Sequence, residues 1–339
     1  MTRTCPSMSP ALDAVIFDCD GVLVDSSASY DRAILQVTAT LLKQFAGVKV
    51  DWRGAGPRLV ERLRMTGGFN NDWDSAYALV MFTAMAAAGP DPGMASRRKS
   101  SILAQVEECV DQVRRLGLAD GAKAVEAVVS RADPDARAAC LGLRRNLGYP
   151  GNPPESALAS TFDGAYYGAT LYRKLYGTDP KGSRRDGLID REVILVREGT
   201  LRRLEEAFRG KIALLTGRTS EATAHTMGRL MKRFDLGSSI FIGDSALGGA
   251  RGRELERYAK PSPLGLIEVM RRLGAKSAHY VGDSGEDVLM AEGAMKMGAS
   301  VAFTGVCRGR GARSKKDFFL RHGADGTIRS VNELPARFA

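Results

Sequence analysis

The pattern of apolar and polar positions divides the chain into two kinds of region. Short apolar runs rich in Val and Ile, typical of strands buried in a parallel sheet, occur near the start and again after residue 190. Between them, apolar residues recur at helical spacing, and breakers such as 89–93 and 149–154 separate the helical segments. We therefore expect a strand-and-helix region interrupted by a helical one.

The alternation of strands and helices predicts an α/β fold, with helices wound around a parallel sheet. The expected strands are Leu12–Phe17, Lys211–Leu215, Ile240–Ile242, Ala278–Val281 and Ser300–Phe303. Because the first strand precedes the helical block and its partners follow it, these strands should form one doubly wound core. That core would comprise residues 1–25 and 191–339, and residues 26–190 would form a large helical insertion.

Polar residues with chemical uses follow three of the expected strands. Asp18–Gly21 follows the first strand, Thr216–Arg218 follows the second and Asp283–Asp287 follows the fourth. In an open parallel sheet, ligands bind outside the carboxyl ends of the strands, so the fold should gather these residues. Lys260 comes just before the helix that leads into the fourth strand. We expect all of them to form one site.

The residue types in this expected site favour phosphate chemistry with a hard cation. Several carboxylates in one cleft repel each other unless a cation lies among them, and carboxylates with a backbone carbonyl and water suit Mg²⁺. No His or Cys ligand set accompanies them, which disfavours zinc. A carboxylate can attack phosphorus, and a second one two residues later can act as general acid and then base. Thr216 and Lys260 offer hydrogen bonds and positive charge to a phosphoryl group.

These motifs, in this order, resemble those of the haloacid dehalogenase-like superfamily, in its subfamily IA phosphatase branch. The resemblance rests on Asp18–Ser26, Leu215–Gly217, Lys260–Pro263 and Val281–Ser284 with Asp287, and covers about half of the chain. It implies a Rossmann-like core with a helical cap inserted between the first motif and the Thr216 motif. The insertion here is much longer than the small bundle usual in subclass I members.

The resemblance also assigns catalytic and phosphate-binding roles. It makes Asp18 the nucleophile and Asp20 the general acid and base. Thr216, Gly217 and Lys260 become the phosphate-binding residues. Dehalogenases of the superfamily lack a carboxylate two residues after the nucleophile, so Asp20 favours phosphoryl transfer.

The resemblance further implies a Mg²⁺ site. Asp283 would bind the metal directly, together with Asp18 and the backbone carbonyl of Asp20. Asp287 would hold the metal's waters or Lys260. The implied enzyme is a Mg²⁺-dependent phosphatase that hydrolyses a small phosphorylated metabolite through an aspartyl-phosphate.

Two other functions stay open at this point. A phosphomutase would hand the phosphoryl group to a second sugar hydroxyl instead of water. A non-catalytic protein that binds RNA or other anions would use the formal charge of +10, from 49 Lys and Arg against 39 Asp and Glu. The acidic motifs disfavour nucleic acid as a partner, because they would repel its backbone unless a metal is bound.

Two residues beside the motifs are expected outside the catalytic set. Asp244 lies in Gly243-Asp244-Ser245, which imitates the Asp283 motif. It precedes Lys260, whereas the acidic motif of the superfamily follows the lysine, so we place Asp244 in a loop near the rim. Arg218 should lie at the surface or behind the catalytic side chains rather than among them.

The cysteines and the apolar runs favour a cytoplasmic protein without a membrane partner. The five cysteines are scattered and show no metal-binding or paired spacing, which indicates buried free thiols. Met1–Pro10 lacks the apolar run of a secretory signal. No apolar stretch approaches the roughly 18 residues that would cross a bilayer. The oligomeric state and the path of residues 89–154 stay open.

Overall fold

The computed structural model describes residues 12–69, 71–88, 95–118, 120–180, 186–248, 254–309 and 311–338. Its contacts divide the chain into two compact units, Met1–Ser26 with Glu192–Ala339, and Ser27–Arg191. The segment for which a secretory signal was tested, Met1–Pro10, lies outside the described residues. Across the described part of the chain, every helix is too short or too polar to cross a membrane.

The first unit is built on six parallel strands in the order β5-β4-β1-β6-β7-β8. They are β1 (Ala14–Phe17), β4 (Ile212–Thr216), β5 (Ile240–Phe241), β6 (Ser277–Gly282), β7 (Ser300–Val306) and β8 (Gly326–Ile328). In the centre, Ile16 of β1 pairs with Ala213 of β4 on one side and with Tyr280 of β6 on the other. The five predicted strands are confirmed.

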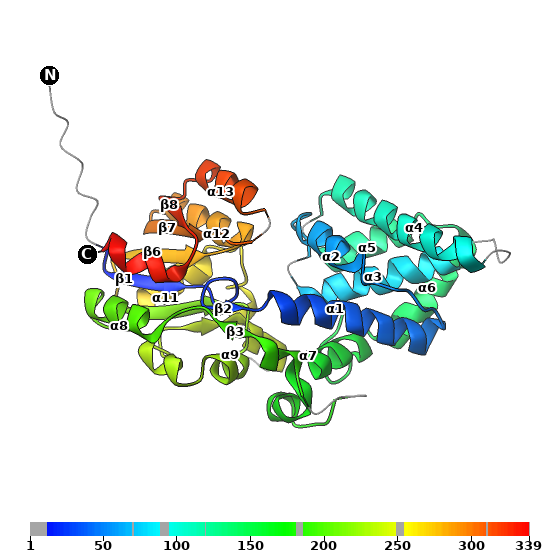
Figure 1. Ribbon diagram of the computed structural model, residues 1–339, viewed down its shortest axis with the longest axis horizontal. Helices are drawn as coiled ribbons and strands as arrows, with labels where there is room; N and C mark the ends of the chain where they lie inside the picture. Colours follow the sequence, from blue (N-terminus) through cyan, green and yellow to red (C-terminus); the bar gives the residue numbers. More distant parts are fainter. Residues whose placement is uncertain are drawn as a thin grey trace, which may run out of the picture. The chain divides into compact units, whose positions relative to one another are not determined.

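Helices cover both faces of this sheet, because successive side chains of each buried strand point to opposite faces. Val15 and Phe17 of β1 pack with α8 (Glu198–Ala207), α9 (Ser220–Met227) and the 3₁₀ segments η3 (Gly228–Arg233) and η5 (Val331–Arg337). Ala14 and Ile16 pack with α11 (Leu264–Arg272), α12 (Gly285–Lys296) and α13 (Ala312–Arg321) on the other face. Figure 1 shows α8 and α9 on one side of the sheet and α12 and α13 on the other. The expected doubly wound α/β fold is confirmed.

A short antiparallel ribbon joins the two segments of this unit that border the insertion. β2 (Val24–Asp25) pairs with β3 (Val193–Ile194), so that Val24 lies opposite Ile194. The backbone N–H groups of Leu195 and Val196 both donate to the carbonyl of Leu23. Two-residue strands are too short to leave a recognisable alternation in a sequence, so β2 and β3 were not predicted.

The second unit is helical, as the pattern between the strand regions predicts. Its α-helices are α1 (Ser27–Leu41), α2 (Gly56–Arg64), α3 (Asp72–Ala87), α4 (Ala95–Leu116), α5 (Gly121–Val129), α6 (Pro134–Leu147) and α7 (Ala157–Tyr176), with the short segments η1 (Leu42–Ala46) and η2 (Leu188–Arg191).

Helix α3 forms the centre of the helical unit. All residues from Ser75 to Ala84 are buried, and α1, α4, α5, α6 and α7 pack around them. A helix that is apolar on all sides is typical of such a central position. Its start is defined by Asn71, whose side-chain oxygen accepts a hydrogen bond of 2.9 Å from the N–H of Trp73.

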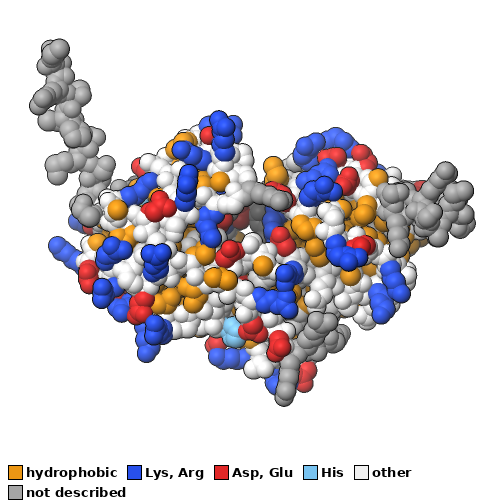
Figure 2. Space-filling model, viewed as in Figure 1, with side chains coloured by type: hydrophobic (Ala, Val, Ile, Leu, Met, Phe, Trp, Pro, Cys, Tyr) orange, Lys and Arg blue, Asp and Glu red, His pale blue; other side chains and the backbone are white. Residues whose placement is uncertain are grey.

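Acidic and basic side chains are interspersed on the surface. On the face that Figure 2 shows, Lys and Arg lie among Asp and Glu and form no continuous basic strip. Several of them are paired: Glu268 lies 2.8 Å from both Arg271 and Arg272, and Arg233 lies 2.8 Å from Glu205. Pairs of this kind contribute little to stability, because water and salt screen the charges.

Gly305 in β7 tests the packing of the sheet against α13. A Cβ added there would lie 2.1 Å from the ring of the fully buried Phe319, so the ring would have to move. We expect Gly305→Ala to lower the free energy of unfolding by about 1–3 kcal/mol in urea denaturation. Gly199→Ala in α8, where a Cβ meets nothing within 4 Å, is the control and should leave stability unchanged or slightly raised. Equal stability of the two variants would contradict the described packing.

Candidate active site

The carboxyl edge of the sheet gathers the acidic residues that the sequence predicts. Asp18 follows β1 and Asp283 follows β6, and these two strands are neighbours in the sheet. Oxygens of Asp18, Asp283 and Asp287 all lie within 4.8 Å of one another. Asp18 and Asp287 are almost completely buried, at 7% and 0% exposed. The distance between Asp18 and Asp283 therefore allows both to bind one ion.

Lys260 places a positive charge between two of these carboxylates. Its Nζ lies 2.9 Å from Asp18 Oδ1 and 2.8 Å from Asp287 Oδ1. Burial alone would lower the pKa of this lysine, but the two carboxylates raise it well above its ordinary value. Lys260 is therefore a fixed cation beside the carboxylate of Asp18.

Asp287 is held by hydrogen bonds on both of its oxygens. Oδ1 accepts from the hydroxyl of Tyr280 at 2.6 Å, as well as from Lys260. Oδ2 accepts from the N–H of Asp283 at 3.0 Å, and from the N–H and hydroxyl of Ser284 at 2.9 and 2.7 Å. Since a carboxylate has about four lone-pair positions, these donors leave no room for a metal ion. Asp287 thus anchors Lys260 and the loop after β6.

The same contacts control the ionisation of Asp287. Burial alone would raise the pKa of its carboxyl, but Lys260 and the hydrogen-bond donors lower it below its ordinary value. Burial raises the pKa of Asp18 well above its ordinary value, and the neighbouring carboxylates add to this while Lys260 opposes it. A cation beside Asp18 would favour its ionised form.

A glycine lets the loop after β1 pack directly against Asp283. Gly21 has a φ of 70°, and a Cβ added there would lie 2.3 Å from the carboxyl group of Asp283. Any other residue would be strained in its backbone and would push this carboxylate away. The loop that carries Asp18 and Asp20 therefore lies against Asp283.

Thr216 and Gly217 lie at the end of β4, the strand beside β1 on the side opposite β6. Thr216 is fully buried, and its hydroxyl accepts a hydrogen bond of 3.2 Å from the N–H of Arg218. A Cβ added at Gly217 would meet nothing within 4 Å, so its backbone borders open space. This placement is compatible with phosphate binding, which stays a prediction for both residues.

Asp20 and Arg218 lie next to each other. Asp20 accepts a hydrogen bond from the side chain of Ser26, and its Oδ1 lies 3.4 Å from Nη1 of Arg218. Burial raises the pKa of Asp20, and Arg218 partly offsets this. The guanidinium of Arg218 is completely enclosed, with its other amino group 2.5 Å from Glu192. Of the two positions expected for Arg218, the surface is therefore wrong, and it lies behind the acidic residues.

Lys315, which comes from α13, was not predicted from the sequence. Its Nζ lies 3.0 Å from Asp283 Oδ2 and opposes the rise that burial causes in the pKa of Asp283. A signal for it existed, because Lys315 belongs to the basic stretch that follows β7 at the same edge of the sheet.

The charges of the cluster fit a divalent cation. Three basic side chains face five carboxylates, namely Lys260, Lys315 and Arg218 against Asp18, Asp20, Asp283, Asp287 and Glu192. Burial raises the pKa of the Asp18, Asp20 and Asp283 carboxyls, so a cation among them would favour their ionised forms. Hard carboxylate oxygens without a sulfur or imidazole ligand suit Mg²⁺.

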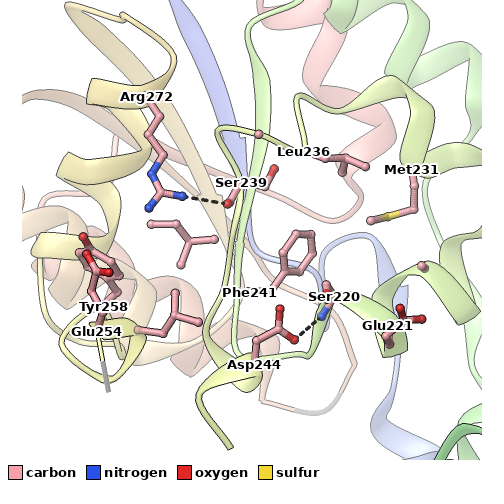
Figure 3. A pocket seen from close by; sticks show the side chains of 14 residues that line it. Ser220, Glu221, Met231, Leu236, Ser239, Phe241, Asp244, Glu254, Tyr258 and Arg272 are labelled. Atoms are coloured by element: carbon pink, nitrogen blue, oxygen red, sulfur yellow. Dashed lines mark hydrogen bonds between the residues drawn. The ribbon is translucent and has the colours of Figure 1, made fainter. Parts of the chain in front are cut away.

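Asp244 lies elsewhere, beside a pocket at the β5 edge of the sheet. Its Oδ1 accepts a hydrogen bond of 2.9 Å from the N–H of Ser220, at the start of α9. The pocket has a volume of about 490 Å³, and Figure 3 shows Asp244 at its wall with Phe241, Tyr258 and Arg272. None of the residues lining it belongs to the cluster of Asp18 and Lys260.

The comparisons with known proteins show similarity in structure. Neither a family model nor a curated protein matches the chain. Phosphatase Tt82 from Thermococcus thioreducens has a TM-score of 0.59 and 22% identity, covering 95% of this chain and 97% of that one. A structural-genomics target solved by X-ray crystallography has a TM-score of 0.57 and 16% identity, covering 96% of this chain and 98% of that one. At this identity the likeness shows the fold alone.

Proposed function

We propose that this protein is a Mg²⁺-dependent phosphoric monoester hydrolase that acts on a small phosphorylated metabolite. One observation carries the proposal. The carboxylate of Asp18 lies 2.9 Å from the Lys260 ammonium and within 4.8 Å of the Asp283 carboxylate, at the edge of the sheet where ligands bind. A nucleophilic carboxylate beside a fixed cation and a possible metal ligand is what phosphoryl transfer through an aspartyl-phosphate requires.

The proposed reaction has two steps. An oxygen of Asp18 attacks phosphorus, the bond from phosphorus to the ester oxygen breaks, and Asp20 gives its proton to the departing alcohol. Asp20 then takes a proton from water, which attacks the phosphorus of the aspartyl-phosphate and releases inorganic phosphate. Asp18 and Asp20 are thereby restored to their starting protonation states.

The remaining residues stabilise charge. Lys260 would offset the negative charge that builds up on the phosphoryl oxygens, and Thr216 with Gly217 would donate hydrogen bonds to them. Mg²⁺, held by Asp18, Asp283 and the backbone carbonyl of Asp20, would reduce the repulsion between the nucleophile and the phosphate. Asp287 would keep Lys260 in place through its contact of 2.8 Å.

We also propose that the helical unit Ser27–Arg191 acts as a cap that excludes bulk water and selects a small substrate. The acidic cluster supports a small anionic partner over nucleic acid, because its carboxylates would repel a nucleic-acid backbone unless a metal is bound. A cytoplasmic location is supported by four described cysteines, Cys19, Cys109, Cys140 and Cys307, all of them buried free thiols.

A screen of phosphorylated metabolites with Mg²⁺, with released phosphate as the readout, tests the activity directly. We expect phosphate release from at least one small monoester, and loss of this release when Mg²⁺ is removed by a chelator. Release of phosphate to water, rather than its transfer to another hydroxyl of the substrate, distinguishes hydrolysis from mutase activity. No release from any monoester would contradict the proposal.

The role of Asp18 is tested by Asp18→Asn, which removes the nucleophilic oxygen and keeps the size of the side chain. We expect turnover of an aryl phosphate to fall by about 10⁴-fold or more, as is typical when a covalent nucleophile is lost. Asp244→Asn makes the same chemical change outside the cluster and should keep wild-type turnover. Robust Mg²⁺-dependent turnover by Asp18→Asn would show that Asp18 is not the nucleophile.

Lys315 gives a test of the metal site. Because its ammonium lies 3.0 Å from Asp283, it competes with a cation for that carboxylate. We expect Lys315→Gln to lower the Mg²⁺ concentration for half-maximal turnover about fivefold, which corresponds to roughly 1 kcal/mol for a partly exposed pair. Lys316→Gln removes the same charge from the next, exposed position and is the control. Equal effects of the two substitutions would argue against metal binding at Asp283.

A further inference from the structure

Behind the acidic cluster lies a completely enclosed ion pair. Nη2 of Arg218 is 2.5 Å from Oε2 of Glu192, and neither side chain is exposed to solvent. The hydroxyl of Thr226 connects the two, since it accepts from Nη2 at 3.2 Å and donates to Oε2 at 2.9 Å. Nη1 of the same guanidinium lies 3.4 Å from Asp20 Oδ1. One arginine thus faces both the buried pair and the proposed acid and base.

Stability alone does not account for this pair. Enclosing two charges requires their desolvation, and a well-packed apolar pair of the same size is often as stable or more stable. The pair does fix the orientation of Arg218, because a planar guanidinium whose Nη2 is held has little freedom to move its Nη1.

The segments that supply these residues are themselves connected. Asp20 bridges to Val24, at the start of β2. Strand β2 pairs with β3, and Glu192 directly precedes β3. Glu192 is therefore fixed relative to the loop of Asp20 by backbone pairing, and Arg218, at the end of β4, links the two by side-chain contacts.

The division of the guanidinium between its partners affects what Asp20 can do. An arginine with no other partner tends to grip a carboxylate with two parallel hydrogen bonds. Here Glu192 and Thr226 engage Nη2, and Nη1 lies 3.4 Å from Asp20 Oδ1. Asp20 also accepts a hydrogen bond from the side chain of Ser26. The guanidinium of Arg218 and the Ser26 hydroxyl together orient the carboxylate of Asp20.

We propose that Arg218 is a positioning residue for Asp20, and that Glu192 and Thr226 hold its guanidinium in the orientation this requires. The inference rests on the proposed phosphatase activity, in which Asp20 protonates the leaving alcohol. Proton transfer requires Asp20 to lie within about 2.6–3.2 Å of the leaving oxygen, and a displacement near 1 Å can reduce the rate about 100-fold.

The dependence of rate on the leaving group tests this proposal. Nitrophenolate leaves without a proton, whereas an alkoxide needs one, so only alkyl phosphates depend strongly on the position of Asp20. We expect Arg218→Lys and Glu192→Gln to lower kcat/KM for an alkyl phosphate about 100-fold, and for nitrophenyl phosphate less than about fivefold. If Arg218 and Glu192 have only a structural role, kcat/KM should fall by the same factor for both substrates. That result would overturn the proposal.

A double-mutant cycle with Asp20→Asn adds a second, independent criterion. If Arg218 acts through Asp20, Arg218→Lys should cause no further loss with the alkyl phosphate once Asp20 has been replaced. If the loss of activity in the double variant equals the product of the two single losses, Arg218 acts independently of Asp20. That result would overturn the proposal.

Matched controls distinguish an effect on the position of Asp20 from the loss of an ion pair elsewhere and from unfolding of the variant. Arg233→Lys and Glu205→Gln alter another ion pair of the same unit, at 2.8 Å. They should leave kcat/KM for both substrates unchanged. Thermal unfolding checks that each variant is folded. Thr226→Val removes the bridging hydroxyl at nearly constant volume, so it tests the proposal even if Arg218→Lys does not fold. We expect it to lower kcat/KM more for the alkyl phosphate than for nitrophenyl phosphate.

The outcomes also distinguish this proposal from the function on which it depends. A wild-type protein without activity on any monoester would refute the phosphatase function itself. An active wild type whose Glu192→Gln and Thr226→Val variants keep the leaving-group dependence would refute only the role of Arg218.

Discussion

The site depends on one buried ammonium group that lies between two carboxylates. Lys260 is 2.9 Å from Asp18 and 2.8 Å from Asp287, and its positive charge offsets the repulsion between these carboxylates. The lysine is fixed in turn because Asp287 is fixed, through Tyr280, Ser284 and the backbone after β6. The geometry of the proposed nucleophile is therefore set by a carboxylate that does not itself react.

The two carboxylates beside Lys260 differ because their surroundings differ. Burial alone would raise the pKa of Asp287, but the charge of Lys260 and hydrogen bonds on both oxygens lower it. Asp18 accepts the N–H of Cys19 at 2.7 Å on the oxygen that also faces Lys260, and burial keeps its pKa raised. Carboxyl groups whose environments separate their pKa values typically have different roles. Here Asp287 anchors Lys260, and Asp18 is the proposed nucleophile.

Site residues could be predicted from the sequence where their positions follow from the order and direction of the strands. Asp18, Thr216 and Asp283 each follow a predicted parallel strand, and the carboxyl ends of such strands meet at one edge. The contacts of Lys315 and Arg218 could not be predicted in this way, because they depend on how long side chains pack between segments far apart in the chain. The partner of Arg218, Glu192, follows the whole helical insertion. Strands β2 and β3, which bring it there, have two residues each.

The ribbon of β2 and β3 explains how a long insertion is compatible with a tightly defined site. The entropy required to close a loop grows only slowly with its length, so a large insertion is tolerated if its ends are held together. The pairing of Val24 with Ile194 joins the two core segments that border the insertion, whatever the length of the insertion between them. Because Asp20 precedes this ribbon and Glu192 directly precedes its return strand, the same pairing that closes the insertion also holds Glu192, which we propose orients Arg218. The boundary of the helical unit and the orientation of the proposed general acid thus depend on one short piece of backbone.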